Sequence, residues 1–455
     1  MSVTAFFSSV KKLPFSQATA LAVPMMLANI STPLMGIADT AMLGRLDDAS
    51  YLAGVAVGVN MLTLLFWMCA FLRMSMTAAV GKSYGAQKIQ SAINCLTQST
   101  VIALVLAVLF IILHRWYLPV FVGWVSQSVE VYQNALAYSY IRIWSAPFVL
   151  LTYVFMGWLM GAQKMRAIVI VTLVLNGLNI LLDYLFILVF HWGVQGAAWA
   201  TVFSECCAFI LTSGLMLNTI KARSKVALSV KIKAGMRRGI LTAQQCIPLL
   251  KTNSHLFVRT LLLLLVFNFF TAQGGVFGDD VVAANAILLQ LMFIGVFAID
   301  GYAYAGETMT ARAIGSKNIS TLHGITVCVL FVGIVISVFF TVFFTLAQPY
   351  LVSIMTSIDS VKTVTNEYYI WLLMMPIVSV ACYIFDGLLI GAGKTKALQQ
   401  GMLISVFGVF LPVWWASLAW DNHGLWLGLI LFHVSRGVTL IIFYVKITQK
   451  SGWYV

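Results

Sequence analysis

Charged residues are scarce in this chain of 455 residues: they make up 9% of it, whereas hydrophobic residues make up 61%. Soluble globular proteins carry about 25% charged residues. A chain this long and this apolar cannot shield its surface from water in a compact soluble shape, and no hydrophilic domain interrupts it. The composition therefore excludes a soluble protein and predicts one whose solvent is the lipid bilayer.

Motifs of catalysis and cofactor binding are also missing. The sequence contains no glycine-rich phosphate loop, no nucleophile triad and no cluster with metal-ligand spacing. The seven cysteines lie in or beside apolar runs, where we interpret them as small packing residues. We therefore expect no enzyme activity, no cofactor and no bound metal. A transporter without an ATP site would have to draw its energy from an ion gradient.

Apolar runs long enough to cross a bilayer, which takes about 20 residues, recur along the whole chain. The alternating pattern of membrane β-barrels is absent. We predict an all-α integral membrane protein of about twelve helices, with a six-helix lobe at 1–219, a cytoplasmic linker at 220–253 and a second six-helix lobe at 254–455. The runs lie near 15–43, 51–79, 92–113, 130–159, 166–190, 195–219, 254–276, 281–306, 321–347, 364–390, 398–418 and 424–446.

Lysine and arginine are unevenly divided between the loops. If both termini are cytoplasmic, the cytoplasmic segments hold most of the 27 basic residues, whereas the external loops hold only Arg45, Arg115 and Lys362. Basic residues accumulate on the cytoplasmic side of membrane proteins. The pattern predicts a multi-pass protein of a bacterial inner membrane with both termini in the cytoplasm. It also explains the net charge of +13 without nucleic acid as a partner.

The two halves of the sequence resemble each other. The segment GAQKMRA begins at Gly161 and matches GAGKTKA, which begins at Gly391, and three further landmarks repeat at nearly the same shift. A shift of six helices gives two halves of the same orientation, related by an axis along the membrane normal. Such repeats commonly form two bundles with a substrate cavity between them, which predicts alternating access by rocking of the bundles.

Asp39 is an ionisable residue of the first predicted helix, which also contains Pro24 and Pro33. Ionisable residues within a span are costly and usually mark functional sites. Burial disfavours the charged form of a carboxyl group, so Asp39 is a candidate for gaining and losing a proton. Proline bends helices, so we expect this helix to be bent or bendable. The alternative is that Asp39 only caps a helix end near the external loop.

The fifth predicted helix carries a polar stripe in an apolar surrounding. Asn176, Asn179 and Asp183 are spaced three and four residues apart and therefore share one face. Such a stripe points into a bundle or a water-filled cavity, where it could bind a proton or a sodium ion. The alternative is an interhelical hydrogen-bond seam. The equivalent stretch of the second half contains no carboxylate, so the acidic pair belongs to the first half alone.

Further polar residues lie in the other spans. Asp300 and Asp386 are candidates for a secondary ion site or a contact with a cationic substrate, although both could equally be paired structural charges. For the charged residues Arg142 and Glu205 we favour a structural role in ion pairs, as we do for Arg73 and Arg436. Thr201, four residues before Glu205, is expected to line a polar cavity.

Methionine and aromatic side chains adapt to varied apolar ligands, and aromatic rings also hold cations. Most of the 20 Met, 30 Phe and 13 Trp residues are expected to face lipid or pack inside the bundles. A few should line the substrate cavity, and the candidates are Met35, Asn60, Met61 and Phe66.

At these residues the sequence resembles a known family. The segments PLMGIADTAMLG around Asp39, NGLNILLD ending at Asp183 and WGVQGAAWAT ending at Thr201 look like the multidrug and toxic compound extrusion (MATE) family, in particular its DinF-type bacterial branch. The resemblance covers essentially the whole chain. It implies a V-shaped transporter with two lobes and a central cavity, which exports drugs in exchange for protons or, in some members, sodium.

The resemblance also implies roles for particular residues. Asp39, Tyr140, Asn179, Asp183 and Thr201 would form a polar network in the first lobe, and Pro24 would be the hinge of the first helix. Protonation of the network would bend that helix and shrink the cavity, which expels the substrate. Other branches hold sodium with an acidic and tyrosine cluster in the second lobe. Here Asp386 is kept without a clear partner set in the seventh helix, which favours protons.

We therefore predict a secondary active multidrug exporter, which exchanges cationic or amphipathic compounds for protons, with sodium as the less favoured ion. The alternative is a flippase for lipid-linked precursors from the same superfamily, although such proteins usually have fourteen helices and more arginines in the cavity. An ion channel or a membrane-embedded enzyme fits the pattern less well. The expected partners are small molecules and the bilayer, and we expect a monomer.

Overall fold

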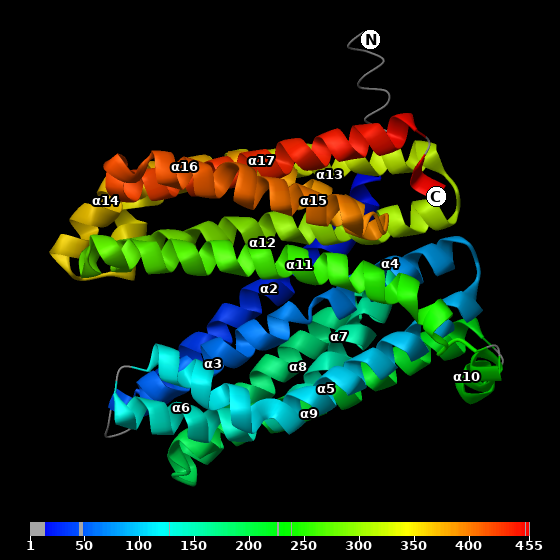
Figure 1. Ribbon diagram of the computed structural model, residues 1–455, viewed down its shortest axis with the longest axis horizontal. Helices are drawn as coiled ribbons and strands as arrows, with labels where there is room; N and C mark the ends of the chain where they lie inside the picture. The colour runs from blue at the N-terminus through cyan, green and yellow to red at the C-terminus, as the bar shows by residue number, and fades with distance from the viewer. Residues whose placement is uncertain are drawn as a thin grey trace. The chain divides into compact units, whose positions relative to one another are not determined.

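The computed structural model describes residues 14–44, 49–126, 128–224, 227–237, 239–450 and 452–454. Arg45 and both chain ends lie outside these ranges. The described part is helical, and Figure 1 traces the order of its helices. The α-helices are α2 (Phe15–Leu43), α3 (Ala49–Met68), α4 (Phe71–Gly85), α5 (Ile89–Val125), α6 (Val129–Arg142), α7 (Ala146–Gly161), α8 (Met165–Asp183), α9 (Gly193–Arg223), α10 (Leu228–Arg237), α11 (Ala243–Gly274), α12 (Asp279–Gly315), α13 (Ile319–Met355), α14 (Asp359–Gly391), α15 (Thr395–Ser405), α16 (Leu411–Ala416) and α17 (Asp421–Gln449).

The helices have the length and composition of membrane spans. Within the described ranges, eleven segments are long and apolar enough to cross a bilayer. In addition, α2 is 29 residues long, more than the roughly 20 residues that the hydrocarbon core requires. Most predicted runs lie on one helix, whereas the runs near 51–79, 130–159 and 398–418 are each divided between two consecutive α-helices. The basic stretch between the halves contains the short helix α10. The prediction of an all-α membrane protein of about twelve spans is confirmed.

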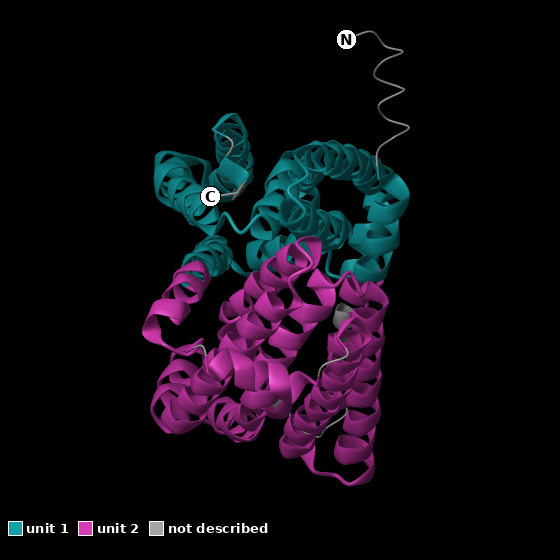
Figure 2. Ribbon diagram, turned by 90° about the vertical axis from the view of Figure 1, so that its right-hand side faces the viewer, with its two compact units in different colours: residues 1–26, 254–455 teal, residues 27–253 magenta. Residues whose placement is uncertain are grey.

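The chain forms two compact units, which Figure 2 shows in different colours. We call residues 27–253 the first unit (magenta in Figure 2, where the key labels it unit 2) and residues 1–26 and 254–455 the second unit (teal, labelled unit 1). The boundary after Asn253 lies where the predicted linker ends. The linker belongs to the unit of the first half, and the N-terminal segment up to Met26 groups with the unit of the second half. Helix α2 therefore begins in one unit and ends in the other.

The internal repeat is visible in the way that helices cross. In the first unit, Gly157 and Gly161 of α7 lie so close to the backbone of Arg73 and Thr77 in α4 that an added Cβ atom would overlap it. In the second unit, Gly387 and Gly391 of α14 lie against α12 in the same way, at Ala303 and Glu307. The shift that relates Gly161 to Gly391 relates all four residues to their counterparts. Small residues allow membrane helices to pack this closely.

The turns that follow these helices repeat with the same spacing. Gln87 and Lys317 come after α4 and α12, and Gln163 and Gly393 come after α7 and α14. All four residues adopt positive φ angles between 56° and 66°. One shift along the sequence therefore relates equivalent turns as well as equivalent helix crossings, and the two halves share one backbone plan.

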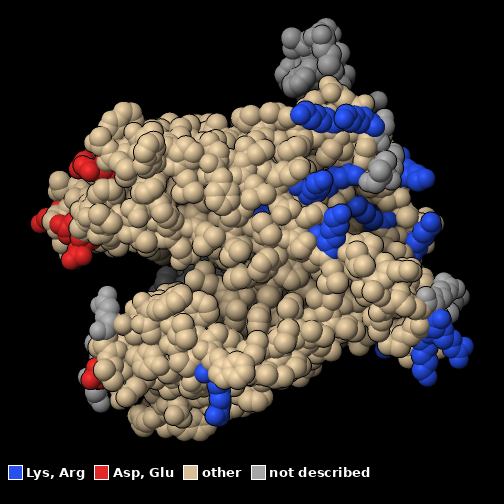
Figure 3. All heavy atoms as spheres, viewed as in Figure 1, with Lys and Arg blue, Asp and Glu red and all other residues tan. Residues whose placement is uncertain are grey.

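In the second unit, acidic residues lie at the starts of several helices and basic residues lie near their ends. Helices α12, α14 and α17 begin with acidic residues, whereas α12 ends near Arg312 and α17 near Lys446. Figure 3 shows the acidic side chains at one end of this unit and the basic side chains at the other. The uneven division of acidic and basic residues between the two ends of the spans, which the sequence indicated, is thus present on the surface of this unit.

Candidate functional site

The polar stripe of α8 is buried, as its spacing predicted. Asn176, Asn179 and Asp183 are 6%, 1% and 2% exposed. Asn176 Nδ2 donates to Ser31 Oγ of α2 at 2.9 Å, and Asn179 Nδ2 donates to Thr201 Oγ1 of α9 at 3.4 Å. The polar face of α8 thus contacts α2 through the Asn176 amide and α9 through the Asn179 amide.

The carboxyl groups of Asp39 and Asp183 form a pair between α2 and α8. They lie within hydrogen-bonding reach of each other. Asp39 Oδ1 and Asp183 Oδ2 are buried and have no hydrogen-bond partner among the described residues. Two ionised carboxylates in such a place repel each other, and a hydrogen bond between them needs a proton on one of them. The geometry is therefore suited to holding a proton.

Thr201 lies between Asn179 of the polar stripe and a tyrosine of α6. The Thr201 hydroxyl accepts the Asn179 amide and donates to the carbonyl of Ala197 at 2.9 Å. Tyr138 is 3% exposed, lies within hydrogen-bonding reach of Thr201, and is close enough to Asp183 for electrostatic interaction. The polar network therefore extends over α2, α6, α8 and α9, within a single unit.

Tyr140 occupies a different place. Its ring packs edge-on against His114 of α5, with the ring centroids 5.5 Å apart. The structure places Tyr138 rather than Tyr140 beside Thr201, and the role that the resemblance implied for Tyr140 stays a prediction. The sequence did contain an indication that Tyr138 faces the network, in the spacing of residues along α6. Tyr138 and Arg142 are four residues apart on one face, and Arg142 pairs with Glu205 of α9.

A π-helix begins directly after Asp183, at Tyr184–Val189. Single turns of π-helix occur frequently at functional sites. The second unit also contains a π-helix, at Val406–Phe410. The shift that relates the two halves places it opposite residues 176–180, so it is not the counterpart of the π-helix that follows Asp183.

Asp386 of the second unit is held by two arginines. It forms ion pairs with Arg259 of α11 and, at 3.6 Å, with Arg436 of α17. Asp300 of α12 interacts electrostatically with Arg259. The resemblance led us to expect no clear set of sodium-binding partners for Asp386 in the seventh span, and this stays a prediction. The partner that α11 supplies is a basic residue, Arg259, so Asp386 is a paired charge.

Arg142 and Glu205 form a bidentate ion pair in the first unit. Both hydrogen bonds between the guanidinium and the carboxylate measure 2.6 Å, and the side chains are 11% and 14% exposed. The guanidinium also lies over the ring of Phe66, 5.3 Å from its centroid. Phe66 is 3% exposed, so it packs beneath this pair. The ion pairs favoured for Arg142, Glu205 and Arg436 are present.

The first half of α2 is anchored within the second unit. Thr19 Oγ1 and the Tyr302 hydroxyl of α12 are 3.1 Å apart. Gly301 approaches α2 so closely that a Cβ atom there would lie 3.0 Å from the carbonyl of Ala22. Pro24 lies at the end of this anchored half, two residues before the unit boundary, and the rest of the helix leads to Asp39.

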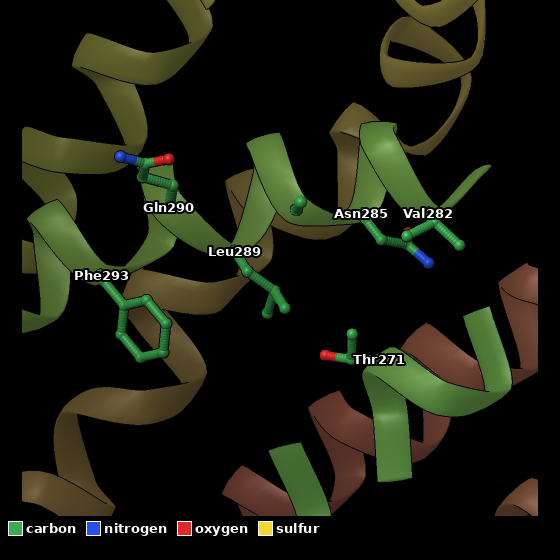
Figure 4. Close-up of a pocket in the computed structure, with 7 residues that line it drawn as sticks. Thr271, Val282, Asn285, Leu289, Gln290 and Phe293 are labelled. Carbon is green, nitrogen blue, oxygen red and sulfur yellow. The ribbon is translucent and has the colours of Figure 1, made fainter. Parts of the chain in front are cut away.

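Each unit contains a cavity between two helices. In the first unit, a shallow, open cavity of about 530 Å³ lies between α2 and α8 and is lined by Ala38, Ala41, Met42, Gly177, Ile180, Leu181, Tyr184 and Leu188, but not by Asp39 or Asp183. In the second unit, a cavity of about 320 Å³ lies between Thr271 of α11 and the residues Val282, Asn285, Ala286, Leu289, Gln290 and Phe293 of α12, most of which Figure 4 shows. Both volumes are within the range of small-molecule sites.

The predicted cavity residues are not among those that line these two cavities. Met35 and Met61 are half-buried, and Asn60 is exposed. Their role in substrate contact stays a prediction. Within the described ranges, no group of three or more His, Cys, Asp or Glu side chains could hold a metal ion. The unpaired oxygens of Asp39, Asp183 and Asn179 are the ligands available to a bound proton or hard cation.

Comparison with known proteins gives the family. The MatE family model matches residues 24–185 and 256–415, one stretch in each half. The chain belongs to the MatE family. DNA damage-inducible protein F of Escherichia coli strain K12 is 34% identical over 437 residues, which cover 95% of this chain and 93% of that protein. This agrees with the resemblance to the DinF-type branch.

Two more distant matches support the same placement. A probable multidrug resistance protein NorM of Buchnera aphidicola is 22% identical over 474 residues, which cover 95% of this chain and 97% of that protein. The solved structure of a MOP superfamily transporter from Pyrococcus furiosus has a TM-score of 0.85 at 18% identity and covers 98% of this chain and 99% of its own. The fold is that of MATE transporters. As a MatE member, the chain is a transporter and not an enzyme.

Proposed function

We propose that this MatE protein exports cationic or amphipathic compounds in exchange for protons, and that the Asp39–Asp183 pair carries the proton. The observation on which this rests is the pair itself. Asp183 is buried and Asp39 is half-buried, and the two carboxyl groups lie within hydrogen-bonding reach of each other. The binding of a single proton therefore changes the total charge of the pair. A cation and a proton compete for such a site, and this competition is the physical requirement for exchange.

The surroundings of the pair support an amphipathic substrate. The neighbouring cavity of about 530 Å³ is lined almost entirely by apolar side chains, which suit the body of a drug-sized molecule. The deprotonated pair would attract the positive charge of the substrate. Protonation would remove that attraction and lower the affinity for the cation, which favours its release.

The path of α2 through the structure supports a way in which proton binding at Asp39 would bend this helix. The helix is anchored to α12 in the unit of the second half, passes Pro24, and carries Asp39 in the other unit. Proline leaves a helix without one backbone hydrogen bond and lowers the cost of bending. A change in charge at Asp39 would therefore act on a helix whose opposite end is fixed to the other unit.

The pairing of Asp386 supports protons over sodium. A sodium site needs oxygen ligands that are free to turn toward the ion. In the second unit, Asp386 already faces Arg259 and Arg436, and their positive charges repel a cation. The same pairing weakens the flippase alternative, because the buried arginines of both units face carboxylates of this chain.

The test uses the full chain in liposomes loaded with a fluorescent amphipathic cation such as ethidium. Exchange of one proton for one monovalent cation moves no net charge, so a pH difference alone should drive it. One pH unit stores about 1.4 kcal/mol per proton, enough for roughly tenfold accumulation. We expect transport with a pH gradient in the absence of sodium. Transport that needs a sodium gradient would contradict proton coupling.

Substitutions distinguish the role of the Asp39–Asp183 pair from the general effect of removing one negative charge. Asp39→Asn and Asp183→Asn should each abolish transport driven by a pH gradient while the protein remains folded. Asp279→Asn is the matched control, since Asp279 is an exposed carboxylate in the first turn of α12, and it should transport at the wild-type rate. Full transport by Asp39→Asn would remove this residue from the mechanism.

A further inference from the structure

The segment that joins the two halves has a composition that transport does not explain. Between positions 220 and 253 it contains eight basic residues and no acidic residue. Helix α10 lies in the middle of this segment and is strongly amphipathic. The basic residues are Lys221, Arg223, Lys225, Lys231, Lys233, Arg237, Arg238 and Lys251, of which Lys225 and Arg238 lie outside the described ranges.

The inner side of this segment is fixed to α5 by amide side chains. Gln90 Nε2 donates to the Lys231 carbonyl at 3.1 Å, and Gln98 Nε2 donates to the carbonyls of Ile240 and Gln245 at 2.7 and 3.2 Å. Gln90 also donates to Asn94, with which it shares one face of α5. This amide row holds the backbone of the segment in one place.

A glycine brings α10 close to this row. Gly235 is the buried residue of the helix, and a Cβ atom at this position would lie 2.9 Å from Asn94 Oδ1. Because the contacts with α5 are made by backbone groups and a glycine, the longer side chains of α10 are left to face outward.

The outer side of α10 presents both apolar and basic side chains. Val230 and Met236 are 55% and 51% exposed, and Lys233 and Arg237 are exposed as well. An exposed valine and methionine are unfavourable in water, whereas they fit the boundary between headgroups and acyl chains. The basic groups on the same side fit the negative charge of anionic headgroups.

We propose that α10 binds the headgroups of anionic phospholipids, with Lys233 and Arg237 on the phosphates and with Val230 and Met236 inserted at the level of the first acyl carbons. The linker between the halves is thereby fixed to the membrane surface on one side and to α5 on the other. This site is separate from the carboxyl pair and does not depend on the proposed proton exchange.

The test measures binding of a fluorescent phosphatidylglycerol to the full chain in neutral detergent, with phosphatidylcholine as the comparison lipid. Each basic side chain near an anionic surface contributes about fivefold in affinity. The double variant Lys233→Gln with Arg237→Gln should therefore bind phosphatidylglycerol at least about tenfold more weakly. The variant Lys233→Arg with Arg237→Lys keeps both charges and should bind as the wild type does.

A matched control removes the same charge elsewhere at the basic ends of the helices. Lys446 and Lys450 are exposed at the end of α17, and replacing both by glutamine should leave the affinity for phosphatidylglycerol unchanged. An equal loss in both double variants, or no loss in the α10 variant, would overturn the proposal.

Two further conditions distinguish a lipid from other anions. About 1 M salt shortens the screening length to about 3 Å and should abolish the preference for phosphatidylglycerol over phosphatidylcholine. Glycerol phosphate lacks acyl chains and should not compete at equal concentration. Competition by glycerol phosphate as strong as that by unlabelled lipid would mean that α10 binds free phosphate groups, and the lipid proposal would be wrong.

Discussion

The ion pair between Arg142 and Glu205 should be a structural element whose loss lowers stability without changing the ion that drives transport. Replacing Glu205 by Gln keeps the shape of the side chain but leaves the Arg142 guanidinium facing a neutral amide. The two hydrogen bonds of 2.6 Å lose their ionic character, and the guanidinium remains buried beside the ring of Phe66.

The expected cost follows from the burial of the pair. Both side chains are largely buried, and removing one partner of a buried ion pair costs about 3–5 kcal/mol because it leaves an uncompensated charge. Glu205→Gln and Arg142→Met should each lower the free energy of unfolding by about this amount. The double variant should lose less than the sum of both, since it buries no unpaired charge.

The assay is thermal unfolding of the purified variants in detergent, combined with transport per folded molecule in liposomes. We expect both single variants to unfold at lower temperatures than the wild type and the folded fraction to retain transport driven by a pH gradient. Single variants that unfold at the wild-type temperature would refute the reasoning. A folded Glu205→Gln protein without transport would give Glu205 a functional role.

Three further tests, two of them with a matched control substitution, address other parts of the account. Tyr138→Phe should slow transport because it removes the hydroxyl beside Thr201, whereas Tyr140→Phe should not; the reverse result in the liposome assay would restore the network that the resemblance implied. Pro24→Ala should lower the turnover rate by stiffening α2, and an unchanged rate would count against bending. Gly391→Ala places a Cβ atom into the facing backbone and should lower the yield of folded protein, whereas Gly214→Ala, which meets no atom within 4 Å, should not.

Patterns that repeat along one helix were predictable from the sequence. The stripe Asn176, Asn179 and Asp183 follows helical spacing, and all three side chains are buried together as predicted. The internal repeat also needed only the sequence, and its shift relates the glycines of equivalent helix crossings. In both cases the signal is local or periodic, because the geometry of a helix determines which residues share a face.

Contacts between helices were predicted less well. Tyr138 and Tyr140 are two residues apart on α6. The position of Tyr138 beside Thr201 shows that Tyr138 faces the network, and the pairing of Arg142 with Glu205 on α9 agrees with it. The sequence allowed a paired charge at Asp386 but gave no indication that Arg259 of the seventh span is its partner. Which of two nearby polar residues meets a distant helix depends on how the helices are rotated, and periodicity alone does not determine this rotation.

The division of α2 between the two units was also not predictable from the sequence. The helix is continuous in the chain from Phe15 to Leu43, so the sequence alone predicts that all of it belongs to the first lobe. Its first half packs on α12 through Thr19 and the close approach at Gly301. These contacts join positions that are far apart in the chain, and no local sequence pattern predicts them.

The most direct test of the central claim is to count protons when substrate binds. Purified protein in weakly buffered detergent solution is mixed with an amphipathic cation, and the change in pH is followed. If the Asp39–Asp183 pair exchanges its proton for the cation, binding releases about one proton per molecule bound, and the Asp39→Asn variant releases none. Binding of the cation to the wild type without release of protons, at a pH at which transport occurs, would contradict the account.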